Sequence, residues 1–301
     1  MENEKILRKY SSPFTYYQGE SLFLENPVTG YVRGFNLNPL EELIVLSVNE
    51  MLVTTSSLLQ RFLKRRKNVD VSAQEIKRVL SVLSHHDYLN KYMFKNINGS
   101  HATTRCYTIS TNGQKHLAYL GIRTKMRGYL SSLTSCEIKE ILSTHQFILS
   151  QEGYTDSGIK FANVVVERGK DTTLTNHIFR TNALVQTEFK TVFVESVRAS
   201  EDSENEFITK LHRIEKTLRE SKFLSCTVSP KCELIIVCEN PDHREVFGEV
   251  LKKIGLRTCF DILITDDVTC YNEPENCLTK IVIPPKSIFT KLFAGITASF
   301  R

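Results

Sequence analysis

Apolar side chains recur at helical spacing in the segment that follows Asn38 and Pro39. Asn38 suits the cap of a helix and Pro39 its first position, and the apolar residues from Leu40 to Met51 fall on one face. The pattern therefore predicts a helix over residues 39–51 with one buried side.

Two further segments show the same periodicity. One starts at Thr54 or Thr55 and ends in the basic run Lys64–Lys67, and the other starts at Ser72, with Glu75 at the spacing of a capping box. We expect a second and a third helix from these segments.

The period then changes to that of strands. Residues 88–95 and 101–110 read as a hairpin around a turn at residues 96–99, and a short helix over residues 113–120 can be capped by Gly121. Three helices followed by a hairpin is the element order of a winged helix-turn-helix.

The order of predicted elements gives an α+β chain of two domains. We expect an N-terminal arm over residues 1–37, a winged helix-turn-helix over 38–122, a basic linker over 123–134, and an α/β mixed-sheet domain over 135–301. The elements expected in the last domain are helices over 135–149, 203–222 and 242–254, and strands over 161–167, 178–186, 191–197, 234–238, 260–264 and 279–283.

Charge is divided unevenly between the two domains. Residues 1–130 carry 18 Lys and Arg against 10 Asp and Glu, a net charge of +8, while residues 131–301 carry 21 against 24, a net charge of −3. A basic domain joined to a mildly acidic one indicates a polyanion partner for the first domain.

The third predicted helix has a polar outer face, and the hairpin carries basic residues. Such a helix fits a major groove about 12 Å wide, and cations on a hairpin reach phosphates. Protein docking and RNA binding stay open as alternatives for this domain. The candidate DNA-binding residues are Gln74, Lys77, Arg78, Ser81 and His85 on the helix, and Lys91, Lys95 and Arg105 on the hairpin.

One constellation in the second domain bears on catalysis. A metal-dependent nuclease of the restriction-endonuclease fold needs an Asp at the end of one strand, and an acid and a Lys on the next. Asn182 stands in place of the Asp, Glu195 is present, and Val197 occupies the Lys position, so that only Lys210 on the following helix could substitute. Because an amide lacks the charge that a divalent metal needs, we expect no catalysis, no metal and no cofactor.

The remaining features indicate no further site. The eight cysteines form no Cys-x-x-Cys pair and no zinc-binding spacing, so they are interpreted as core residues in a reducing compartment. Asp261, Asp266 and Asp267 lie near a strand end and are interpreted as loop acids. With no signal peptide and no apolar run of about 18–20 residues, a cytoplasmic protein is expected.

Over residues 38–285 the chain resembles the replication-relaxation family of plasmids and integrative elements. The segments that carry the resemblance are residues 37–44 and 107–117, Thr181-Asn182-Ala183, Glu195-Ser196-Val197-Arg198, and Lys210. The resemblance implies a winged helix joined to a domain of restriction-endonuclease type, and a role in plasmid replication or in conjugative mobilisation beside a relaxase. Asn182 and Val197 depart from the family pattern at the would-be catalytic site, which favours a protein that binds DNA without cutting it.

These observations lead to one expected function and two alternatives. We expect a sequence-specific double-stranded DNA-binding accessory protein that acts at an origin of transfer or replication and recruits a relaxase or an initiator. The acidic second domain would then serve protein contacts or a homodimer, with no membrane partner. The alternatives are a Mg²⁺-dependent nuclease and a winged-helix transcriptional regulator.

Overall fold

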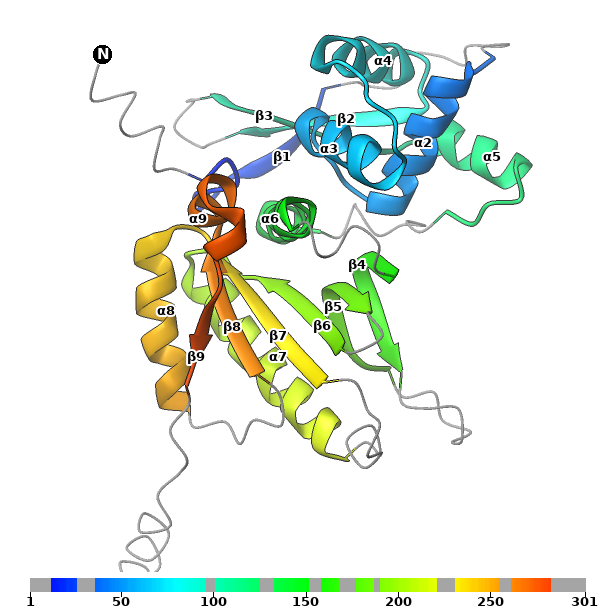
Figure 1. The fold of residues 1–301 in the computed structure, drawn as a ribbon. Coiled ribbons are helices and arrows are strands. Elements are labelled where there is room, and N and C mark those ends of the chain that lie inside the picture. The colour runs from blue at the N-terminus through cyan, green and yellow to red at the C-terminus, as the bar shows by residue number, and fades with distance from the viewer. Residues whose placement is uncertain are drawn as a thin grey trace, which may run out of the picture.

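The computed structural model describes residues 12–25, 36–95, 101–124, 133–151, 158–167, 177–186, 190–220, 231–254 and 261–282. Over these residues the chain has a mixed α and β fold with two separate sheets (Figure 1). One sheet has three strands in the order β1-β2-β3, and the other has six in the order β4-β5-β6-β7-β8-β9.

Three helices form where the periodicity predicts them, and capping residues set where they begin. Asn38 and Glu41 form a capping box, and the Thr55 side chain accepts from the backbone of the second helix. Ser72 accepts from the Glu75 amide, but the Glu75 carboxylate pairs with a neighbouring arginine in place of the reciprocal bond expected of a capping box. The helices are α2 (Pro39–Met51), α3 (Ser56–Arg66) and α4 (Ala73–His85).

The smaller sheet packs against these helices. The expected hairpin is confirmed as β2 and β3, while residues 96–100, which include the expected turn, lie outside the described residues. The sequence left residues 1–37 as an arm, but part of that segment forms β1, which pairs antiparallel with β2 so that Phe23 lies opposite Met93. The elements are β1 (Ser21–Leu24), β2 (Leu89–Lys95), β3 (His101–Ile109) and α5 (Thr111–Tyr119), which Ser110 caps.

The larger sheet is mixed, as predicted. Its first three strands are antiparallel, β6, β7 and β8 are parallel, and β9 is antiparallel to β8. Parallel neighbours need a crossover connection, and α7 and α8 supply it, burying apolar side chains against one face of the sheet. The elements are β4 (Gly158–Glu167), β5 (His177–Gln186), β6 (Lys190–Ser196), α7 (Glu201–Glu220), β7 (Lys231–Cys238), α8 (Pro241–Ile254), β8 (Asp261–Asp266) and β9 (Thr279–Ile281).

Two helices cover the opposite face, α6 (Ser135–Ser150) and α9 (Asp267–Asn272), the second of which is followed by a short 3-10 turn. The predicted cap of α6 was wrong by one residue. Thr134 is the N-cap and forms a capping box with Glu137, while the Ser135 hydroxyl donates to the Glu20 carbonyl at 2.8 Å.

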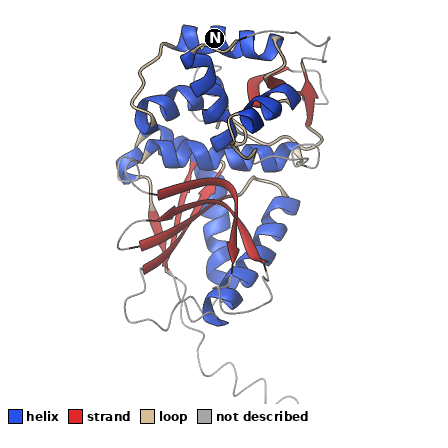
Figure 2. Cartoon of the chain, turned by 90° about the vertical axis from the view of Figure 1, so that its right-hand side faces the viewer, coloured by secondary structure: helices blue, strands red, loops and turns tan. Residues whose placement is uncertain are grey.

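Helix α6 lies between the smaller-sheet part of the chain and the larger sheet (Figures 1 and 2). It is buried nearly all round, and one apolar cluster joins Phe62 of α3 and Phe94 of β2 through Phe147 of α6 to Val194 and Ile235 of the larger sheet. The parts before and after residues 125–132 therefore share a core. Among the described helices, none is long and apolar enough to cross a membrane.

Candidate nucleic-acid interface

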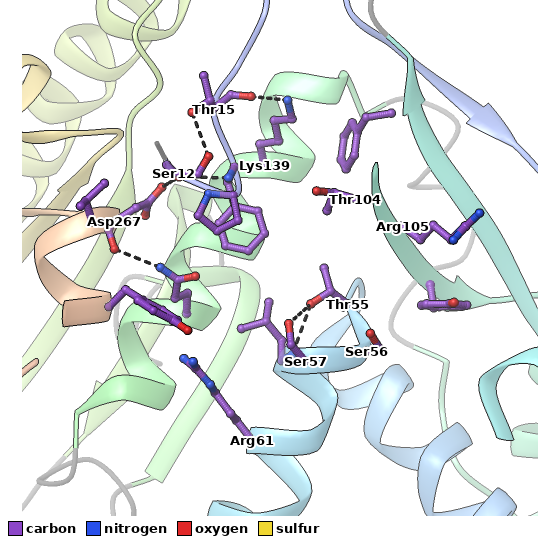
Figure 3. A pocket seen from close by; sticks show the side chains of 18 of the residues that line it. Ser12, Thr15, Thr55, Ser56, Ser57, Arg61, Thr104, Arg105, Lys139 and Asp267 are labelled. Carbon is purple, nitrogen blue, oxygen red and sulfur yellow. Dashed lines mark hydrogen bonds between the residues drawn. The ribbon is translucent and has the colours of Figure 1, made fainter. Parts of the chain in front are cut away.

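A cleft with a volume of about 1260 Å³ lies between the two parts of the chain (Figure 3). One wall consists of α4, the start of α3 and a face of the β2–β3 hairpin, and the other of residues 12–17 with α6 and α9. Segments far apart in the sequence thus meet around one cavity.

Four of the eight predicted DNA-binding residues line this cleft: Lys77 and Ser81 of α4, Lys91 of β2 and Arg105 of β3. The other three on α4 do not line it but are exposed on the adjacent surface of the same helix, and they are Gln74, Arg78 and His85. The backbone of Lys95 ends β2, and its side chain lies outside the described residues.

The two hairpin cations share one carboxylate. Glu25, just after β1, accepts from Lys91 Nζ at 2.8 Å and from Arg105 Nε at 3.0 Å. Burial acts to raise the pKa of Glu25, but the hydrogen bonds and charges of Lys91 and Arg105 outweigh it and lower that pKa. One positive charge therefore remains in excess at this point of the hairpin.

Arg78, the predicted base-contacting arginine, is also paired. Its guanidinium binds Glu75 in a fork, with Nε at 2.9 Å and a terminal nitrogen at 2.7 Å from the two carboxylate oxygens. Both side chains are exposed on α4. Water screens such a pair, so the arginine can exchange Glu75 for a phosphate or a base edge at small cost.

Sequence reasoning missed the residues that complete the cleft. Arg61 of α3 lies over the ring of Tyr271 of α9, 5.3 Å from its centre, and Lys139 of α6 lies 5.3 Å from the centre of the Tyr17 ring. Arg61 lies just before the basic run Lys64–Lys67, and its charge does not stand out from that run in the sequence. Nothing local to the sequence of Tyr17 or Tyr271 indicates that each ends beside a cation.

Lys139 is held as part of the wall. Its ammonium donates to the Thr15 carbonyl and to Glu20, and it is almost wholly buried. Burial lowers the pKa of Lys139, while Glu20 counteracts that effect. Because Glu20 neutralises this charge, the excess charge of the cleft comes from its other cations.

A buried ion pair anchors the same wall at the carboxyl edge of the parallel strands. Arg198, after β6, donates to Asp267 at 2.8 Å, and neither side chain is more than 1% exposed. Ser12 and Ser143 also donate to Asp267, each at 2.5 Å. The interpretation of Asp261, Asp266 and Asp267 as loop acids is wrong: the first two begin and end β8, and the third begins α9. Asp266 and Asp267 are buried, and Ser12 and Ser143 of α6 contact the second of them.

The nuclease-like residues lie together where β5 and β6 of the larger sheet meet α7. Lys210 Nζ donates to Glu195 Oε2 at 2.6 Å, while the other oxygen of Glu195 is buried without a hydrogen-bond partner among the described residues. Ala183 pairs with Val194, so Asn182 and Glu195 each lie one residue beyond that pair on neighbouring strands. Val197 is fully buried in the apolar cluster under α7 and α8. No group of three His, Cys, Asp or Glu suited to a metal occurs in the described part of the chain.

A second acid near this group was not predicted. Glu140 of α6 accepts from the Ser203 hydroxyl at 2.7 Å. Burial raises the pKa of Glu140 from 4.5 to about 7, and the charge of Glu195 adds to this effect, while Ser203, Arg198 and Lys210 act against it. Glu140 is one of many polar residues in the sequence of α6, and nothing local distinguishes it from the others.

Comparison of the chain with protein-family models, with curated proteins and with solved structures gives no match in any of the three. The interpretation of the cleft therefore depends on its own residues and their chemistry.

Proposed function

We propose that the protein binds double-stranded DNA through α4 and the β2–β3 hairpin and does not cut it. The observation that carries this proposal is the charge of the cleft beside α4. Arg61, Lys77, Lys91 and Arg105 line it, and Glu25 pairs with the last two, which leaves an excess of three positive charges. Lys139 and Asp267 also line the cleft, but each is neutralised, by Glu20 and by Arg198. Such an excess favours phosphate groups, which supply most of the affinity of proteins for DNA.

The exposed face of α4 supplies the second element of the proposal. Gln74, Arg78 and His85 continue the polar surface that begins with Lys77 and Ser81 at the cleft. In this proposal α2, α3 and α4 with the hairpin act as a winged helix-turn-helix, α4 enters the major groove, and the hairpin contacts the backbone.

The larger sheet is proposed to act as a platform of restriction-endonuclease type without catalysis. Asn182 offers no charge beside Glu195, and Lys210 already neutralises that acid. The net charge of −3 over residues 131–301 suits a protein partner better than DNA. The resemblance noted above supplies the setting: an origin of transfer or replication in a plasmid or integrative element, with a relaxase or an initiator as the partner.

The test is a binding titration of the full chain against duplex fragments from the element that encodes it, at several salt concentrations. The full chain is needed because a fragment ending before α6 would expose the shared apolar cluster. Lys77→Ala should weaken binding to all fragments alike and make the slope of log K against log salt shallower by about 0.9. Lys253→Ala, an exposed lysine of α8 outside the cleft, is the control.

Tight binding to one origin-like fragment, with no cleavage in Mg²⁺, is the expected result. Binding to no fragment, or binding that is independent of salt, would refute the proposal and favour a protein-docking role. Cleavage in Mg²⁺ that Glu195→Ala abolishes would favour a nuclease.

A further inference from the structure

We infer that the cleft holds a single strand of DNA beside the duplex bound by α4. This inference rests on the proposed function and names the second form of nucleic acid that the same surface takes. It would place the protein at a junction between duplex and melted DNA.

The exposed face of α4 and the cleft differ in shape, and this difference assigns duplex DNA to the first and single-stranded DNA to the second. A duplex is read by convex elements, such as a helix, that enter its grooves, and the exposed face of α4 is such an element. The cleft is concave, and its volume of about 1260 Å³ is larger than the roughly 300–1,000 Å³ of small-ligand pockets. A flexible, extended strand can enter a cavity of this kind, whereas in this inference a rigid duplex stays at its mouth, where α4 and the hairpin still bring their cations to its phosphates.

The aromatic side chains of the cleft point to bases. Tyr271 and Tyr17 line it from α9 and from the N-terminal segment, and their exposed fractions are 61% and 46%. Each ring has a cation about 5.3 Å from its centre, Arg61 for the first and Lys139 for the second. Exposed rings beside cations form the stacking platforms on which proteins bind single strands without strong sequence preference.

The charges of the cleft suit a phosphate backbone. Asp267 is the only acid among the described lining residues, and its carboxylate is bound to Arg198. Arg61, Lys77 and Arg105 belong to the wall that α3, α4 and the β2–β3 hairpin form. Tyr17 and Tyr271 belong to the opposite wall, so a strand can place its phosphates on one side of the cavity and its bases on the other.

The experiment measures fluorescence anisotropy of a labelled oligothymidylate of about 12 nucleotides, within the usual site size of single-strand binding proteins. The full-length wild type, Tyr271→Ala and Tyr271→Phe are titrated in parallel, and a blunt duplex is the second ligand. Tyr271 is largely exposed, so either variant keeps the fold.

We expect Tyr271→Ala to weaken oligothymidylate binding by about 5- to 100-fold. Tyr271→Phe should bind within about twofold of the wild type, because a phenyl ring stacks on bases equally well. Duplex affinity should be the same in all three proteins.

Three results would overturn the inference. The first is that Tyr271→Ala and Tyr271→Phe bind oligothymidylate with equal affinity. The second is that polyglutamate at the same concentration of charge displaces the oligothymidylate. The third is that the wild type binds the duplex but not the oligothymidylate. The last result leaves the proposed function standing. Binding of oligothymidylate without any binding of duplex would refute the proposed function, and with it the duplex part of the inference, and would leave the cleft as a site for a single strand alone.

Discussion

Replacing Glu25 by glutamine should tighten the binding of DNA. The carboxylate of Glu25 lies 2.8 Å from Lys91 Nζ and 3.0 Å from Arg105 Nε, and its pKa is lowered, so it is ionised at neutral pH. It competes with phosphates for both cations. Glutamine keeps the shape of the side chain and removes the charge.

The expected gain in DNA affinity is estimated from the removal of one negative charge. Two unit charges about 4 Å apart in water interact by about 1 kcal/mol, which corresponds to roughly a fivefold change in affinity. Lys91 and Arg105 are 27% and 51% exposed as side chains and Glu25 is 17% exposed, so the aqueous value is the lower bound of the gain. Releasing a second cation for phosphate contact should also steepen the slope of log K against log salt by about 0.9.

The assay is anisotropy with a labelled duplex at several salt concentrations. Glu249→Gln serves as the matched control, because it removes the same charge from an exposed ion pair with Lys252 on α8, outside the cleft. Equal affinity of the Glu25 and Glu249 variants would refute the reasoning. Weaker binding by Glu25→Gln would show instead that the carboxylate positions the two cations for DNA.

Three further predictions concern stability, each measured by urea denaturation. Burial raises the pKa of the Glu140 carboxyl from 4.5 to about 7, so the wild type loses stability as pH rises through this window, by up to about 3 kcal/mol. Glu140→Gln should remove that loss and gain stability over the wild type at pH 8 but not at pH 4; equal pH profiles would contradict this. Gly113→Ala should destabilise by about 1–3 kcal/mol, because a Cβ at residue 113 would lie 2.2 Å from the Tyr88 carbonyl oxygen; an unchanged midpoint would count against this contact. Arg198→Met should cost about 3–5 kcal/mol, because it leaves the Asp267 carboxylate buried without its ion-pair partner; a loss of under 1 kcal/mol would show that this pair contributes little.

Local signals account for the elements that the sequence predicted correctly. Asn38, Thr55 and Ser72 cap α2, α3 and α4 because each side chain bonds to amides of its own first turn. The apolar periodicity also distinguished helices from strands across both sheets. The short strand β1 was missed because its four residues carry too weak a pattern to distinguish them from an arm.

Part of the candidate site was equally visible in the sequence. Lys77, Ser81, Lys91 and Arg105 were predicted from one polar helix face and one basic hairpin, and they line one cleft. The sequence did not show that Lys91 and Arg105 are ion-paired, because their partner Glu25 belongs to the segment that was expected to form an arm.

The sequence by itself determined the features that depend on neighbouring residues or on residue identity alone: the helix caps, the periodicities, the uneven charge of the two parts, and the absence of a carboxylate at Asn182. What only the tertiary structure decided is the second wall of the cleft. Ser12 and Asp267 are 255 positions apart, and Arg61 reaches Tyr271 across the join between the two sheets. Those contacts exist because α6 buries apolar residues against both parts at once, and burial of this kind depends on the whole chain rather than on any local pattern.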